Sequence, residues 1–147
     1  MKSYYQELEI STTRSFEVID ITDNIKTILN NSAILQGMVT VTSLHTTCAL
    51  TINENEERLI EDVRNFFLSI APPDKSYKHN DLHLRVGIPP DEPENAHSHL
   101  IAMMLGNGEV VGISDGELIL GRYQSILLLE LDGPRERRVA LQVVGAK

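Results

Sequence analysis

An unbroken apolar run, Ile126–Leu129, sets the narrowest limit on how this chain folds. A strand with one face in water alternates apolar and polar residues, whereas a continuous apolar run is typical of a strand that is covered on both faces. Segments with strand character surround this run, so a second sheet is expected on one of its faces. The pattern favours two stacked sheets with helices outside them.

The chain has 147 residues, a length that suits one domain. It contains no internal repeat, low-complexity stretch or linker, and it is too short for an eightfold βα barrel, which needs about 250 residues. We therefore expect a single compact domain over residues 1–147 of the α+β class. Two stacked, mostly antiparallel β-sheets would be flanked by two to three helices.

Apolar–polar alternation and turn residues predict eight short strands. Ser114-Asp115-Gly116 is expected to form a hairpin turn between two of them, and residues 132–135 another turn. The expected strand ranges are 4–10, 16–21, 38–42, 48–52, 110–113, 117–120, 125–131 and 138–144.

Three helices are expected between these strands. The first begins with Thr22 as its N-cap and reaches about residue 31. The second, over residues 59–70, has apolar residues at one-, three- and four-residue steps, which is typical of an amphipathic helix. The third, over residues 94–105, ends before Gly106 and is apolar nearly all round, so we expect it to be deeply buried.

The charge and the cysteine count exclude several classes of function. The chain has 13 Lys and Arg against 21 Asp and Glu, a net charge of -8, which disfavours nucleic-acid and anionic-membrane partners. It lacks the roughly 20 consecutive apolar residues that a membrane span needs. Cys48 is the one cysteine, which suits a cytoplasmic location and excludes CxxC zinc sites. Because Cys48 lies in an apolar strand, we interpret it as a core residue.

Five histidines are the most informative polar residues. Four of them lie in the proline-rich loop 72–93 and in the helix after it. His45 instead stands where the strand alternation changes phase, between Leu44 and Cys48, which predicts a bulge or a strand end of the kind where sites are often built. The five are His45, His79, His83, His97 and His99.

Imidazole is the commonest metal ligand in proteins, and three histidines with an open position form a catalytic zinc arrangement. The alternative is that each histidine is a surface residue or a hydrogen-bonded core residue. His97 and His99 are two residues apart, which on a helix turns their side chains about 200° from each other. We therefore expect only one of this pair to face a shared site.

Two further polar segments have a functional and a structural interpretation. In residues 53–57, Asn53 or Asn55 can cap the helix, with carboxylates that complement its dipole, or Glu54 can serve as a general base. In residues 132–138, arginines such as Arg135 can bind phosphate, or they can simply be exposed charges of a solvated turn and an edge strand. Nucleotide-binding and serine-hydrolase motifs are absent from the sequence.

Several separated motifs occur in order along nearly the whole chain. They are 45–56 (HTTCALTINENE), 77–81 (YKHND), 95–100 (NAHSHL), 116–121 (GELILG) and 132–135 (DGPR). Together they resemble the YjbQ-type family. Gln124 and Glu130 also match the family pattern, whereas Tyr123 stands where the family usually has tryptophan.

The resemblance implies a compact homotrimer with two sheets, and a secondary thiamine-phosphate synthase activity, which is a transferase reaction. It also singles out His45, His79 and His99 as characteristic histidines, and we predict that they bind a divalent metal. Zinc suits this ligand set better than magnesium, which prefers oxygen ligands. With Glu54 as the catalytic residue, the predicted substrate-binding residues are Thr46, Thr47, Asn53, Asn55, Gln124 and Arg135.

The first hypothesis is thus a metal-dependent enzyme that acts on a phosphorylated small molecule. Thiamine-phosphate synthesis joins the nitrogen of a thiazole phosphate to an aminopyrimidine and displaces pyrophosphate. A metal-dependent hydrolase is an alternative, because a metal held by three histidines lowers the pKa of bound water to about 7. The other alternative is a trimeric protein that binds a metal or a phosphate ligand without catalysis.

Overall fold

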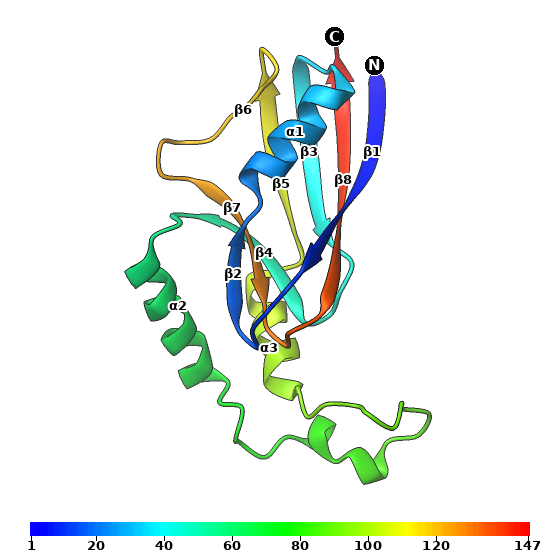
Figure 1. Cartoon of the computed structure of the whole chain (residues 1–147), viewed down its shortest axis with the longest axis vertical. Coiled ribbons are helices and arrows are strands. Elements are labelled where there is room, and N and C mark those ends of the chain that lie inside the picture. The colour runs from blue at the N-terminus through cyan, green and yellow to red at the C-terminus, as the bar shows by residue number, and fades with distance from the viewer.

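A computed structural model describes residues 1–147 and confirms an α+β domain with two antiparallel sheets and three α-helices. Figure 1 shows the strands running along the long axis, with the two termini together at one end. The strand ranges agree with those expected, apart from shifts of a few residues at their ends. No helix is long and apolar enough to cross a membrane.

The larger sheet has five strands in the order β1-β8-β3-β5-β6. The expected hairpin between β5 and β6 is present, and Asp115 and Gly116 both adopt the left-handed backbone (φ 52° and 78°) that such a two-residue turn requires. The bounds are β1 (Lys2–Ser11), β3 (Gln36–Ser43), β5 (Gly108–Ser114), β6 (Glu117–Leu118) and β8 (Glu136–Ala146).

The smaller sheet has β7 (Ser125–Glu130) at its centre, between β2 (Glu17–Asp20) and β4 (Cys48–Asn53). Alternate residues of β7 enter two different cores, so the expectation of a strand covered on both faces is confirmed. Ile126 and Leu128 pack between the two sheets, whereas Leu127 and Leu129 pack against helices on the outer face.

α1 (Thr22–Ser32) closes the core between the sheets, and its buried residues include Ile25 and Leu29. The sequence-based N-cap is wrong, because Thr22 is the first helical residue and caps nothing. The carboxylate of Asp20 accepts hydrogen bonds from the backbone N–H of Thr22 at 3.0 Å and from its hydroxyl at 2.6 Å. Asp20 therefore satisfies the N–H of Thr22, one of the backbone donors that the start of a helix leaves without an intrahelical partner.

α2 (Glu57–Ile70) lies over the outer face of the smaller sheet, and its predicted caps are also wrong. The side chain of Glu56, rather than Asn53 or Asn55, accepts hydrogen bonds from the first backbone N–H groups, at 3.0 Å and 2.7 Å. Although the helix is amphipathic, none of its residues is fully buried. It therefore stands off the sheet instead of packing tightly onto it.

α3 (Ala96–Leu105) ends at Gly106, as expected, and its inner residue Ile101 is fully buried. The expectation of deep burial all round is wrong, because Met103 is 78% exposed and Met104 is 54% exposed. The helix covers the end of the smaller sheet from one side only, so apolar residues on its outer face remain exposed.

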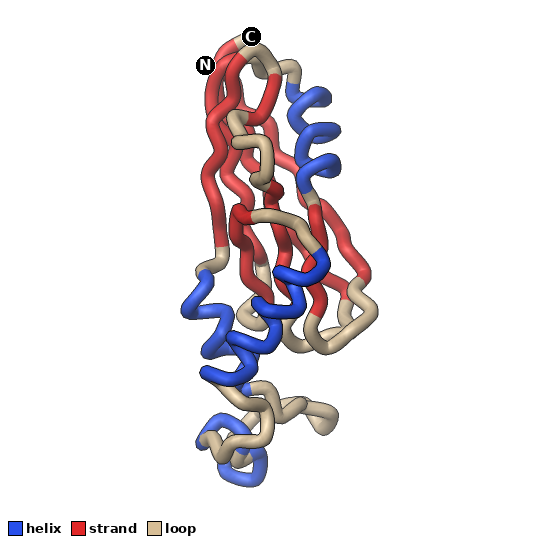
Figure 2. The backbone as a smooth tube through the Cα atoms, turned by 90° about the vertical axis from the view of Figure 1, so that its left-hand side faces the viewer, coloured by secondary structure: helices blue, strands red, loops and turns tan.

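The loop between α2 and α3 extends beyond the ends of the strands (Figure 2). It is ordered by two short 3-10 turns, η1 (Lys78–Asn80) and η2 (Leu82–Leu84), rather than by regular secondary structure. Figure 2 shows this loop with α2 and α3 at the end of the molecule opposite to the termini.

Candidate functional site

The candidate site forms where the chain crosses twice between the sheets. Residues 44–47 connect β3 in the larger sheet to β4 in the smaller one, and residues 131–135 connect β7 back to β8. A hydrogen bond of 3.2 Å from the backbone N–H of Leu131 to the carbonyl of Thr47 joins the two crossings. The phase change at His45 thus marks a strand end, one of the two structures that the sequence predicted.

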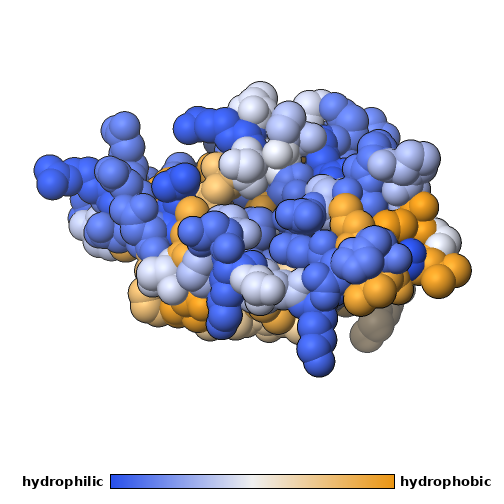
Figure 3. Space-filling model, turned by 90° about the horizontal axis from the view of Figure 1, so that it is seen from below, coloured by the Kyte–Doolittle hydropathy of each residue, from blue (hydrophilic) through white to orange (hydrophobic).

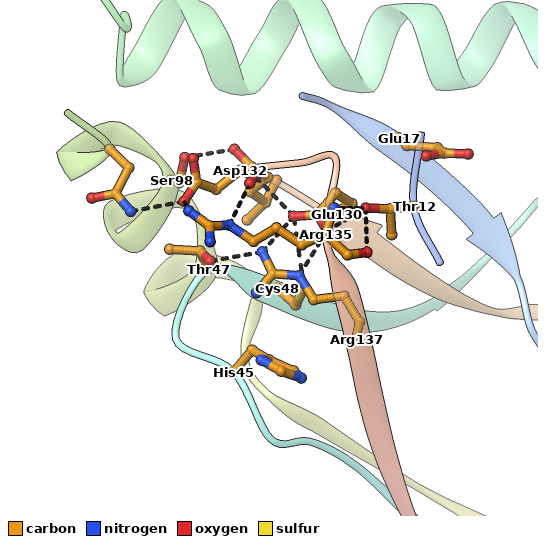
Figure 4. Close-up of polar contacts among 12 residues, drawn as sticks. Thr12, Glu17, His45, Thr47, Cys48, Ser98, Glu130, Asp132, Arg135 and Arg137 are labelled. Carbon is orange, nitrogen blue, oxygen red and sulfur yellow. Dashed lines mark hydrogen bonds and ion pairs between the residues drawn. The ribbon is translucent and has the colours of Figure 1, made fainter. Parts of the chain in front are cut away.

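A buried ion pair between Glu130 and Arg137 joins the sheets at this point (Figure 4). The Arg137 side chain donates to the Glu130 carboxylate through Nε at 2.7 Å and through Nη2 at 2.6 Å, and Nη2 also donates to the hydroxyl of Thr47 at 2.8 Å. Glu130 further accepts from the hydroxyl of Thr12 at 2.8 Å and from the N–H of Asp132 at 2.9 Å. The side chain of Glu130 is 0% exposed and that of Arg137 is 4% exposed.

These contacts determine the charge states of the buried groups. Burial alone would raise the pKa of Glu130, but the hydrogen bonds from Arg137, Asp132 and Thr12 hold it below its ordinary value, so the pair is ionised. Burial and the nearby Glu130 charge raise the pKa of the Cys48 thiol to about 12. Cys48 is therefore an unreactive thiol, as its place in an apolar strand suggested.

Arg137 forms part of the wall of an open pocket of about 470 Å³, which we call the arginine pocket. Its wall is almost entirely polar and comes from three parts of the chain: residues 44–47, residues 89–99, and Asp132, Arg135 and Arg137. Arg135 is oriented by its own turn, because its Nε donates to the carbonyl of Asp132 at 2.9 Å and its Nη2 to the Asp132 carboxylate at 3.0 Å.

Both arginines keep one nitrogen free for a ligand. All hydrogen bonds of the Arg135 and Arg137 guanidinium groups use Nε and Nη2, so Nη1 of each has no partner within the chain. Three carboxylates line the pocket: Asp132 is paired with Arg135 and Glu92 with Arg85, whereas Asp91 forms no ion pair. Nη1 of Arg135 and Nη1 of Arg137 are therefore each available to donate to an anionic group in the pocket.

His45 lies in the same pocket but its Nε2 is already in use. This atom accepts a hydrogen bond of 2.8 Å from the backbone N–H of Arg138. Burial, followed by the charges of Arg137 and Arg138, lowers the pKa of His45, so the imidazole is neutral at pH 7. While this bond holds, His45 has a proton on Nδ1 and no free lone pair for a metal.

His79 and His99 do come together. Their ring centroids are 4.8 Å apart in an edge-to-face arrangement, and Nε2 of His79 is buried without a hydrogen-bond partner. Burial, followed by the proximity of His79, lowers the pKa of His99. The two rings can therefore offer two nitrogen ligands. In this chain no three histidine, cysteine, aspartate or glutamate side chains gather in a way that could hold a metal.

Only one of the two helical histidines faces the arginine pocket, as their spacing predicted. His99 forms part of its wall, whereas His97 does not and its Nε2 lies 3.3 Å from the hydroxyl of Ser98. His83 is exposed on the second 3-10 turn, outside the pocket.

The structure divides the other predicted site residues between two places. Thr46, Thr47 and Arg135 line the arginine pocket, but Asn53 and Glu54 lie at the opposite end of β4, about 17 Å along the strand. The side-chain amide of Asn55 donates to Asp20 there at 3.3 Å, and Gln124 accepts from the N–H of Gly121 at 2.7 Å. Within one chain these residues do not share a site, and the catalytic role of Glu54 stays a prediction.

Sequence reasoning gave no site role to Glu130, which it noted only as a match to the family pattern, or to Arg137. The signal was present in β8, where Arg137 occupies the same strand face as the buried Val139 and Leu141. Likewise, Glu130 directly continues the buried run of β7. A charged residue at a buried strand position calls for an opposite charge nearby, and these two could have been paired on that basis.

Fold and site together define a small α+β protein with a polar pocket built on a buried ion pair. Residues 6–146 match the model of the family described as UPF0047 protein YjbQ-like, and the chain belongs to this family.

Relatives and solved structures agree over almost the whole chain. A UPF0047 protein of Methanothermobacter thermautotrophicus is 41% identical over 99% of this chain and 94% of its own length. The UPF0047 protein YugU of Bacillus subtilis is 32% identical over 94% of this chain and 97% of its own. A YbjQ-like protein of unknown function from Sulfolobus solfataricus has a similar structure, with a TM-score of 0.89, 36% identity and 98% coverage of both chains.

Replacing Arg137 with methionine should destabilise the fold, because it leaves the Glu130 carboxylate buried without its partner. The expected loss at pH 7 is about 3–5 kcal/mol in the free energy of unfolding, measured by urea denaturation. As a control, Arg138→Met removes an exposed pair with Glu7 and should cost less than about 1 kcal/mol.

The stability difference between the wild type and Arg137→Met should depend on pH. The lowered pKa of Glu130 stabilises the wild type above the ordinary carboxyl value, and that contribution is lost as pH falls through the lowered pKa. In Arg137→Met, protonation neutralises the stranded carboxylate, so the stability gap to wild type should narrow on acidification. A gap that stays constant down to pH 4 would contradict the assigned role of the pair.

Proposed function

We propose that the arginine pocket binds the phosphate or pyrophosphate group of a small molecule. The observation that supports this most is the pair of free Nη1 groups on Arg135 and Arg137, one of them on a side chain that a buried carboxylate fixes in place. A fixed guanidinium loses little entropy when it binds an oxyanion, and charge-assisted bonds to phosphate are strong. The hydroxyls of Thr46 and Thr47 belong to the same wall.

We further propose that the chain is an enzyme of the secondary thiamine-phosphate synthase kind. In that reaction the protein has to hold phosphate groups and stabilise the negative charge of the departing pyrophosphate, and needs little covalent chemistry of its own. Arg135 and Arg137 can serve this purpose, while the neutral His45, with its proton on Nδ1, can donate one hydrogen bond. The alternatives are a metal-dependent hydrolase and a binding protein without catalysis.

A divalent metal is part of this proposal, with zinc preferred. Two of its ligands would be the unpartnered Nε2 of His79 and a ring nitrogen of the neighbouring His99. His45 could become a third ligand only after its Nε2 releases the hydrogen bond from the N–H of Arg138. A bound cation would supply positive charge next to the phosphate groups. The role of the chain's own residues is to orient these groups, and burial lowers the pKa of His45 and of His99.

Replacing Arg135 with alanine should weaken the binding of inorganic pyrophosphate at least tenfold, because a charge-assisted hydrogen bond contributes roughly 1.5–3 kcal/mol. Isothermal titration calorimetry at fixed ionic strength measures this. Arg122→Ala, which removes an exposed arginine outside the pocket, is the matched control and should leave the affinity unchanged. Equal losses in both variants would contradict a specific site.

The same variants separate the three functions. If wild-type protein joins the two thiamine-phosphate precursors and Arg135→Ala does not, the synthase proposal holds. Metal-dependent release of phosphate from simple phosphate esters would instead favour the hydrolase. Pyrophosphate binding without turnover of either kind would favour the binding protein.

Removing the metal with a chelator should abolish turnover, and zinc should restore it. His79→Ala should lose zinc affinity by more than tenfold in a competition assay with a chromophoric chelator, because only two imidazoles meet here. His83→Ala is the control, since His83 is exposed outside the site. Full turnover in metal-free protein would contradict metal dependence.

We also propose that the chain assembles as a homotrimer. Figure 3 shows exposed hydrophobic residues at the end of the molecule that carries α3 and the long loop. Met103 of α3 is 78% exposed, and Leu84 and Val86 of the loop are 71% and 98% exposed. Apolar surface of this kind usually marks a protein interface.

Light scattering on the full chain should give three times the mass of one chain. Met103→Glu should lower this mass by placing a charge in the interface, whereas Asn65→Glu on the exposed side of α2 should not. A monomeric wild type at micromolar concentration would refute the assembly.

A further inference from the structure

A second cavity lies between α2 and the outer face of the smaller sheet. Its volume is about 200 Å³, and eight of its eleven lining residues are hydrophobic. α2 supplies Leu59, Val63 and Phe67, while the sheet supplies Leu127 and Leu129. A cavity of 150 Å³ with an apolar lining can hold benzene, so this one has room for a single ring.

The loose seating of α2 explains why this space exists. A helix with such a regular apolar stripe usually buries several side chains completely, yet none of the α2 residues is fully buried. Leu127 and Leu129 beneath it belong to the outer core, and the α2 residues that pack against this core, such as Val63 and Phe67, are only partly buried. The helix therefore roofs a cavity over the sheet instead of filling it.

One end of the cavity is polar and carries a negative charge. Thr51, Asn53 and Glu54 line it there, and no lysine or arginine does. Thr51 is on the same strand face as the buried Ala49, and its hydroxyl has no hydrogen-bond partner within the chain. The Glu54 carboxylate likewise forms no ion pair or hydrogen bond. A ligand that matches this cavity has an apolar ring at one end and a cationic hydrogen-bond donor at the other.

We propose that this cavity binds a ring-sized organic cation, with the ring under α2 and its amine or amidine group on Glu54 and Thr51. The Glu54 end of this cavity lies about 17 Å along β4 from the arginine pocket, and the proposal does not rest on the function proposed for that pocket. The two sites differ in the charge of the ligand that they suit, since the arginine pocket suits an anion and this cavity suits a cation. A burial site for an apolar side chain from a second copy is the competing interpretation, and it requires no charge on the occupant.

Three probes of nearly equal size test the proposal: benzylammonium, the neutral benzyl alcohol and the anionic benzoate. Titrations followed by methyl NMR of the leucine and valine side chains locate and measure their binding. Because Glu54 is exposed and its ion pair is screened by solvent, we expect benzylammonium to bind roughly threefold more tightly than benzyl alcohol, and benzoate not to bind. The shifts should centre on Val63 and Leu127.

Variants identify the groups responsible. Glu54→Gln should reduce benzylammonium affinity to that of benzyl alcohol and leave benzyl alcohol unchanged, whereas Glu57→Gln, which changes a carboxylate outside the cavity, should change neither. Val63→Phe should fill the cavity and abolish binding of both; Val63→Met is the milder replacement if that variant does not fold. Equal affinity for the cation and the alcohol, shifts elsewhere, or no binding at millimolar concentration would overturn the proposal.

Discussion

The buried ion pair of Glu130 and Arg137 is the contact on which the site depends, because it joins the ends of two strands that belong to different sheets. Two opposite charges without solvent are tolerated only when hydrogen bonds satisfy them, and here Thr12, Thr47 and the N–H of Asp132 do so. This requirement fixes how the two chain crossings approach each other. The arginine pocket is a consequence of that approach.

The pair also gives the pocket its electrostatic character. Arg137 is neutralised on its inner side by Glu130 and presents its remaining nitrogen outward, while Arg135 is held by its own turn through Asp132. The charge of the whole chain is negative, yet the local arrangement offers two oriented cationic groups. A net charge describes long-range steering, whereas binding at short range depends on which donors are free.

Much of the fold was predictable, because its determinants are local and periodic. The apolar run of β7 required covering on both faces, and the alternation in β8 and β3 placed the five-stranded sheet. The N-terminal caps of α1 and α2 and the burial of α3 were less predictable. Asp20 accepts from the N–H of Thr22 at the start of α1, Glu56 instead of the two asparagines caps α2, and α3 keeps an exposed outer face. Those outcomes depend on which side chains compete for the same donor and on what packs nearby.

The sequence alone determined the class of fold, the family resemblance and the residues that could carry chemistry, since each of these follows from pattern and order along the chain. Only the tertiary structure decided which of those residues meet. It brought His79 to His99 and used Nε2 of His45 for a backbone hydrogen bond. It also places Glu54 at the end of β4 that is remote from the arginine pocket. Which side chains come together depends on how the chain crosses between the two sheets. That geometry cannot be read from a local sequence pattern.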